Sequence, residues 1–221
     1  MFNEGFKLVN DKEKHMVFYA LKDALSRGDC PICFLAERSV ARDIDGFFHE
    51  MVNDYGVAVK LNKSGGFCEK HSEQIVKTDE TLGIAIIYKR LLDVFIGLLQ
   101  KVAVIPKLAA CPLCGIYSEA EKRYLDALLD HWDELKEIFI ATSILCVNHT
   151  QNALAAAGKR SEIKKGLLGV QINKLSDLSA ELEEICRKHD YRFKDEKWGK
   201  EKDAWQRAVK LMSVVPSRWR D

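Results

Sequence analysis

The sequence has almost no net charge. Among its 221 residues, Lys and Arg number 34 and Asp and Glu number 33. Capture of nucleic acid or of a membrane surface by electrostatics needs a clear basic excess, and this balance gives no indication of either partner. Apolar residues make up 47% and charged residues 30%, as in an ordinary globular protein that is long enough to bury a core.

Targeting and membrane patterns are also lacking. Residues 1–20 contain acidic side chains and no long apolar run, unlike a signal peptide. The most apolar stretch, residues 81–105, carries Lys89, Arg90 and Asp93 near its middle. Charges at that position are costly at the centre of a bilayer. We therefore expect a buried helix there, and a cytoplasmic protein with no membrane partner.

No segment alternates apolar and polar side chains for long enough to predict a strand. Apolar side chains instead recur at intervals of three and four residues, which is the spacing of one helix face. Helices are expected over residues 12–26, 32–53, 81–104, 112–130, 132–142, 161–189 and 200–213. Shorter helices are expected to begin at Cys68 and after Cys146, and the sequence "NKSGG" at 62–66 indicates a break. The predicted fold class is all-α.

The cysteine count argues against a disulfide framework, because seven is an odd number and no secretion signal is expected in this sequence. Six of the seven belong to a phrase that occurs twice, and Cys186 is left over. The phrase is Cys-Pro-x-Cys followed by Cys-x-x-His. It reads "CPIC" at 30–33 with "CEKH" at 68–71, and again "CPLC" at 111–114 with "CVNH" at 146–149.

The phrase marks an internal repeat. A shift of 81 residues aligns the two CPxC motifs and also the helix that follows each of them, and a deletion of three residues then aligns the two CxxH motifs. The sequence thus predicts a first helical unit over 1–80, a linking helix over 81–106, a second unit over 107–158 and a helical C-terminal extension over 159–221.

The repeated phrase has the chemistry of a metal site. Two Cys separated by two residues can place both sulfurs on one ion, and a CxxH pair supplies the remaining two donors of a tetrahedral Cys3His zinc site. The sequence therefore predicts two zinc ions. Their ligands are Cys30, Cys33, Cys68, His71, Cys111, Cys114, Cys146 and His149. Closure of each site within its own repeat is the simpler expectation, and a crossed arrangement is the alternative.

Other interpretations of these cysteines have less support from the sequence. Free buried thiols in a helical core would not require the CxxH partners. A thioredoxin-like redox motif prefers a strand–helix setting, which is not predicted here. An iron–sulfur cluster with one histidine ligand ranks below zinc.

The segment 188–212 is dense in charged and aromatic residues. Within it, Trp205, Ala208, Val209 and Met212 form a helical stripe that we expect to dock on the rest of the protein. The alternative is a polar pocket or partner surface. It would use Arg192, Asp195, Glu196 and Trp198.

Taken together, the CPxC and CxxH pairs, "SGGFCEKH", "LGIAIIYKRLL" and the tail "DYRFKDE…EKDAW" make the chain similar to a bacterial family, domain-of-unknown-function family 6062. The resemblance covers about residues 12–212. It implies an all-helical protein with CPxC/CxxH sites and implies no activity.

The sequence contains no Gly-rich phosphate loop, nucleophile elbow or HExxH helix, so an enzyme is the less favoured class. The preferred hypothesis is a scaffolding protein with two structural zinc sites and an unknown protein or small-molecule partner. A thiol-based redox or metal-responsive protein is the second hypothesis, and an enzyme with its site in the polar tail is the third.

Overall fold

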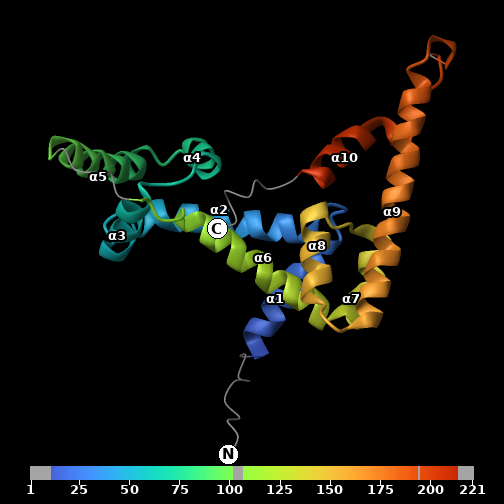
Figure 1. The fold of residues 1–221 in the computed structure, drawn as a ribbon, viewed down its shortest axis with the longest axis horizontal. Coiled ribbons are helices and arrows are strands. Elements are labelled where there is room, and N and C mark those ends of the chain that lie inside the picture. The colour runs from blue at the N-terminus through green and yellow to red at the C-terminus, as the bar shows by residue number, and fades with distance from the viewer. Residues whose placement is uncertain (1–10, 102–106, 194, 214–221) are drawn as a thin grey trace, which may run out of the picture. The chain divides into compact units, whose positions relative to one another are not determined.

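The computed structural model describes residues 11–101, 107–193 and 195–213, and within these ranges it contains helices and no strands (Figure 1). The α-helices are α1 Asp11–Leu25, α2 Pro31–His49, α3 Tyr55–Ser64, α4 Glu69–Val76, α5 Thr81–Gln100, α6 Pro112–Asp130, α7 Trp132–Thr142, α8 Val147–Ala156, α9 Ser161–Lys188 and α10 Ala204–Met212. Two short 3-10 helices, η1 Tyr191–Phe193 and η2 Lys200–Asp203, lie between α9 and α10. The all-α prediction is confirmed.

The described chain forms two compact units. The first contains residues 11–35 and 122–213, and the second contains residues 36–101 and 107–121. The boundaries fall inside α2 and α6, so these units do not follow the ranges of the sequence repeat. The domain ranges drawn from the repeat therefore describe the sequence and stay a prediction.

One helix was missed between the first CPxC and CxxH motifs. The expected helix over 32–53 ends at His49, and α3 then begins at Tyr55. Asp54 caps α3, because its side chain accepts a hydrogen bond of 2.8 Å from the backbone N–H of Val57. Gly65 ends the helix with a φ of 68°, which is a left-handed conformation that glycine adopts without strain. The expected break is thus a helix end.

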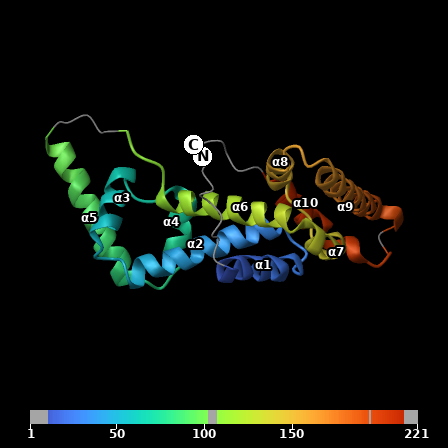
Figure 2. The same ribbon diagram turned by 90° about the horizontal axis from the view of Figure 1, so that it is seen from below.

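The second unit has a core of side chains from α2, α3, α4, α5 and α6. Its buried members are Val40, Ile44, Phe47, Phe48, Val57, Leu61, Ile75, Ile87 and Leu113. Helix α5 was expected to be buried, and this is wrong for most of its length: it approaches the core through Gly83 and Ile87, its two buried residues. A methyl group on Gly83 would lie 3.0 Å from the carbonyl oxygen of Phe48, so glycine allows close packing at this point. Figure 2 shows α5 beside α3.

The first unit is built around α1, α7 and the long helix α9 (Figure 1). Its fully buried side chains include Leu25, Leu128, Leu135 and Phe139. Helix α9 contributes Leu167, Gln171 and Leu178 as its buried residues. Leu168 and Ile172, which lie next to Leu167 and Gln171 in the sequence, are 40% and 59% exposed. The buried face of α9 therefore includes one polar side chain, and the neighbouring apolar positions face away from the core.

The end of the first unit folds back along α9 through η1, η2 and α10. Buried Glu201 of η2 forms an ion pair of 2.6 Å with Lys188 at the end of α9. Helix α10 buries Ala204 and Leu211.

The expected docking stripe of α10 is wrong. Trp205, Val209 and Met212 are 55%, 63% and 60% exposed. Ala208 is half-buried. The sequence pattern did not separate two neighbouring faces of a short helix that both carry apolar residues.

Candidate metal centres

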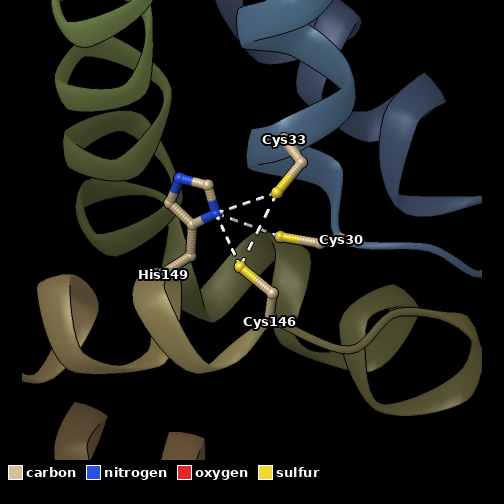
Figure 3. Close-up of side chains that lie close together, drawn as sticks. All are labelled: Cys30, Cys33, Cys146 and His149. Atoms are coloured by element: carbon tan, nitrogen blue, oxygen red, sulfur yellow. Dashed lines mark hydrogen bonds between the residues drawn. The ribbon is translucent and has the colours of Figure 1, made fainter. Parts of the chain in front are cut away.

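The first cluster joins the start of α2 to the start of α8. Its members are Cys30, Cys33, Cys146 and His149, and all four belong to the first unit. Figure 3 shows the three sulfurs and the ring nitrogen Nδ1 of His149 pointing toward one another. Cys30, Cys146 and His149 are 6%, 4% and 1% exposed, and Cys33 is half-buried. The cluster is therefore largely shielded from water.

The spacing of these atoms fits a tetrahedral zinc ion. Zn–S bonds of about 2.3 Å and Zn–N bonds of about 2.0 Å in a tetrahedron place two sulfurs about 3.8 Å apart and a sulfur and a nitrogen about 3.5 Å apart. The sulfurs of Cys33 and Cys146 lie 3.6 Å apart. Nδ1 of His149 lies 3.4, 3.2 and 3.1 Å from the sulfurs of Cys30, Cys33 and Cys146. Small outward movements would complete the coordination shell.

The second cluster repeats this geometry in the second unit. It contains Cys68, His71, Cys111 and Cys114, from the starts of α4 and α6. Nδ1 of His71 lies 3.2, 3.5 and 3.5 Å from the three sulfurs, and the sulfurs of Cys68 and Cys114 are 3.6 Å apart. His71 is 2% exposed, whereas all three cysteines are only half-buried. The same donor set is therefore more accessible to water here.

Each cluster takes its two halves from different repeats. The first CPxC motif meets the second CxxH motif, and the second CPxC motif meets the first CxxH motif. The expected closure within each repeat is therefore wrong, and the crossed arrangement is the one that the structure adopts. All eight predicted residues nevertheless lie in the two clusters, and Cys186 lies in neither and is exposed.

Every donor pair sits at the beginning of a helix. Pro31 and Pro112 are the first residues of α2 and α6. The N–H that proline lacks would have no partner within the helix at this position, so no helical hydrogen bond is lost. Cys68 and Cys146 precede α4 and α8 with nearly equal backbone angles, φ/ψ of −72/164° and −66/166°. Free N–H groups and the positive end of the helix dipole stabilise negative charge at such positions. The repeated phrase therefore produces a local geometry suited to thiolate ligands.

The thiols within a cluster shift one another's pKa in opposite directions. Hydrogen bonds from Cys30 and Cys33 lower the pKa of Cys146, and the hydrogen bond to Cys146 raises the pKa of Cys33. Burial acts to raise the pKa of Cys111, but hydrogen bonds from His71 and from the backbone outweigh it, and the pKa falls to about 6. Each cluster therefore contains one sulfur whose pKa is lowered beside one whose pKa is raised, and a bound divalent cation would displace the thiol protons.

Gln171 of α9 fixes the residue that precedes Cys146. Its Oε1 accepts a hydrogen bond of 3.0 Å from the backbone N–H of Leu145, and its Nε2 donates one of 2.9 Å to the carbonyl oxygen of the same residue. Nε2 also donates to Oγ1 of Thr150 at 2.8 Å. Sequence reasoning missed this residue. The apolar spacing of this helix also runs through Leu168 and Ile172, so nothing in the sequence singled out Gln171.

Two further side chains hold the segment between α7 and α8. Nζ of Lys174 donates to the carbonyl oxygens of Phe139 and Ser143 at 3.1 and 2.7 Å, and burial lowers the pKa of this lysine. Oγ of Ser143 donates to the carbonyl oxygen of Leu25 at the end of α1. The CxxH motif of the first cluster is thus attached to both α9 and α1.

Backbone hydrogen bonds hold the segments that lead into the second cluster. The N–H of Gly66 donates to the carbonyl oxygen of Leu61 at 3.0 Å, and the N–H of Ala109 donates to that of Lys63 at 2.9 Å. Phe67, directly before Cys68, packs its ring against Phe47 and Phe48. The two clusters therefore have the same types of donor residue at helix starts. They differ in the hydrogen bonds and packing contacts that hold the surrounding segments.

The polar residues suggested for the tail do not gather at one point. Arg192 pairs with its neighbour Asp190 on the surface, and Glu196 pairs with Arg187. Asp195 is exposed, and Trp198 is 44% exposed. The Arg187–Glu196 pair instead attaches the tail to the end of α9.

These features define an all-helical protein with two Cys3His clusters, each able to hold a metal ion. The chain belongs to DUF6062, a family of unknown function, which it matches over residues 13–106 and 102–217. The two matched segments agree with the repeated units seen in the sequence.

A curated relative is similar over most of its length. The "Uncharacterized 23.9 kDa protein in xynA 3'region" of Caldicellulosiruptor sp. (strain Rt8B.4) is 29% identical over 171 residues, which cover 74% of this chain and 83% of the relative. No solved structure matches the chain. Among the described helices, none combines the length and apolar character needed to cross a membrane.

Proposed function

We propose that this protein is a cytoplasmic zinc-binding scaffold whose two Cys3His sites are structural, with an unknown protein or small-molecule partner. The observation that carries the proposal is the complete set of four donors in each cluster. A catalytic zinc site keeps a position open for water or substrate, whereas four protein ligands fill the tetrahedron. The bound ion would tie two helix starts together and would not act on a substrate.

The metal content of protein purified without added metal tests this proposal first. Elemental mass spectrometry is expected to find two zinc ions per chain in a colourless solution. Iron with visible absorbance would replace the proposal with an iron–sulfur protein. A metal-free protein whose thiols oxidise in pairs would refute it.

Removal of the metal tests the structural role. Structural zinc contributes about 10–16 kcal/mol of apparent binding free energy in small zinc domains. A strong chelator is therefore expected to cause a large loss of helical circular dichroism that added zinc reverses. Full retention of helicity without metal would show that the ions do not hold the fold.

A second function, metal release on oxidation, is favoured at the second cluster because its three sulfurs are all half-buried. Hydrogen peroxide would be the oxidant. Two thiolates, one peroxide and two protons would give one disulfide and two waters, and the ion would leave with its ligands consumed. The sulfurs of Cys68 and Cys114, 3.6 Å apart, are the candidate pair.

A zinc-binding dye follows this release during peroxide treatment. One ion is expected to leave early and one late, and a Cys68→Ser/Cys114→Ser variant should lack the early phase. A Cys33→Ser/Cys146→Ser variant is the matched control and should retain the early phase. Equal release from both clusters would remove the argument for a redox role.

A further inference from the structure

Helix α4 has few buried contacts with the rest of the second unit. It is 8 residues long, and its buried residues are His71 and Ile75. Because His71 belongs to the second cluster, Ile75 is the one buried side chain of α4 outside the metal centre. Isolated helices shorter than about 12–15 residues are marginal in water, since starting a helix is unfavourable and few hydrogen bonds follow. The stability of α4 therefore depends on what these two residues contact.

The polar contacts of Lys70 and Gln74 do little to stabilise α4. Nζ of Lys70 lies 3.8 Å from a carboxylate oxygen of Glu37, and the two side chains are 48% and 56% exposed. Exposed ion pairs of this kind contribute little to stability. Oε1 of Gln74 is buried and has no hydrogen-bond partner among the described residues, which opposes folding of the helix. His71 and Ile75 thus provide most of the attachment of α4.

The segments around α4 have anchors of their own. Before α4, Phe67 packs its ring against Phe47 and Phe48. After α4, helix α5 joins the core through buried Ile87. Leu113, which lies within the CPxC motif of the second cluster, is fully buried in the same core. If the metal left this cluster, α4 would lose one of its two attachments, whereas the helices around it would keep theirs.

The first cluster is connected to its unit more extensively. Gln171 of α9 bonds to both backbone groups of Leu145 and to the hydroxyl of Thr150, on the two sides of the first residue of the CxxH motif. Ser143 donates to the carbonyl oxygen of Leu25 at the end of α1. A change at this cluster would therefore affect α1 and α9 as well as α8. A change at the second cluster would affect mainly α4.

We propose that occupancy of the second site switches α4 between a docked helix and an unfolded segment, whereas occupancy of the first site stabilises its whole unit. This inference rests on the proposed function, because it requires metal in both clusters. His71 couples the site to the helix: it is 2% exposed, and it lies on the same side of α4 as Ile75, four residues later. Release of α4 withdraws fully buried Ile75 from the core. Metal loss at the second site is thereby converted into exposed apolar surface.

Amide hydrogen exchange measured by mass spectrometry tests the switch in the full-length chain. Cys111→Ser/Cys114→Ser empties the second site without altering α4, and Cys30→Ser/Cys33→Ser empties the first site without altering α8. In the zinc-loaded wild-type chain, exchange in α4 should be at least about tenfold slower than in an unstructured peptide. The Cys111/Cys114 variant should lose this protection in α4 and keep protection in α3 and α5. The Cys30/Cys33 variant is the matched control, and it should keep α4 protected and lose protection in α1, α8 and α9.

Zinc content separates this proposal from the one on which it rests. A wild-type chain that binds no metal would refute the proposed function. If the wild type holds two ions and the Cys111/Cys114 variant holds one, protection of α4 in that variant would overturn the switch alone. Loss of protection that stays within α8 in the Cys30/Cys33 variant would also overturn it, because the two sites would then act alike.

The wild-type chain stripped of both ions repeats the test without substitutions. Exchange in α4 should then match that of an unstructured peptide, while α3 and α5 stay protected. Protection of α4 in the stripped chain would overturn the switch. Loss of protection in α3 and α5 would overturn it too, because the second ion would then hold its whole unit.

Discussion

Paired cysteine substitutions distinguish the crossed clusters from closure within each repeat. Cys33→Ser with Cys146→Ser removes two donors from the same cluster, because their sulfurs lie 3.6 Å apart. Cys33→Ser with Cys68→Ser removes one donor from each cluster. The two variants lose the same number of cysteines. The first is expected to keep one tightly bound zinc ion per chain, and the second is expected to keep none.

The two double variants are also expected to differ in the coupling free energy between their substitutions. A structural zinc site contributes about 10–16 kcal/mol of apparent free energy. Two substitutions in one site should cost little more than the first alone, whereas substitutions in separate sites should add. The coupling between Cys33 and Cys146 should therefore approach the value of one site, on the order of 10 kcal/mol. The coupling between Cys33 and Cys68 should be near zero.

Elemental mass spectrometry after dialysis against a competing chelator provides the assay. Cobalt substitution supplies a second measurement, because visible absorption bands report tetrahedral sulfur coordination at each occupied site. If the Cys33/Cys146 variant lost both ions and the Cys33/Cys68 variant kept one, the clusters would close within the repeats and the crossed arrangement would be refuted.

Three further changes have predictable results. Gln171→Leu leaves the buried N–H and carbonyl groups of Leu145 without their partner, and we expect a loss of about 2–4 kcal/mol in the free energy of unfolding. Gly83→Ala introduces a methyl group 3.0 Å from a backbone oxygen, and chemical denaturation should show a loss of about 1–2 kcal/mol. The hydrogen bonds from the backbone N–H of Gly199 and from Lys188 lower the pKa of Glu201 from 4.5 to about 2, so its stabilising contribution is present above pH 4.5 and is lost as the pH falls toward 2. Tryptophan fluorescence should report this acid transition.

Matched variants control these three predictions. Asn173→Leu on the exposed side of α9 should change the unfolding free energy by less than about 0.5 kcal/mol. Gly97→Ala, where nothing lies within 4 Å of the added carbon, should stabilise α5 by up to about 1 kcal/mol. Glu201→Gln should lack the acid transition. Equal effects in a test variant and its control would contradict the packing described for that position.

Local signals predicted most of the helices and all eight members of the two Cys and His clusters. The three- and four-residue apolar spacing predicted α6 and α7 with the observed bounds. The CPxC and CxxH spacing identified eight residues that lie in two clusters. Helix α3 was not predicted, because it has only two buried residues, Val57 and Leu61, and its clearest signals are its caps. The expected end of α5 near 104–106 lies outside the described residues.

Faces of helices were harder to predict than the helices themselves. On α9 the true buried positions begin at Leu167 and include Gln171. On α10 the structure buries Ala204 and Leu211 and exposes Trp205. An apolar pattern that covers two neighbouring faces is compatible with either orientation, and the neighbouring helices decide between them.

The sequence by itself determined the all-helical class, the repeat and the four helix starts that carry cysteine and histidine. These follow from proline at the first position of α2 and α6, from cysteine directly before α4 and α8, and from the side-chain period, which are local properties. Only the tertiary structure decided which CPxC motif meets which CxxH motif. The two CxxH motifs begin with nearly the same backbone angles, and both copies of each motif carry the same donors, so local chemistry cannot distinguish the partners. The choice comes from packing, which brings the start of α2 to α8 and the start of α6 to α4.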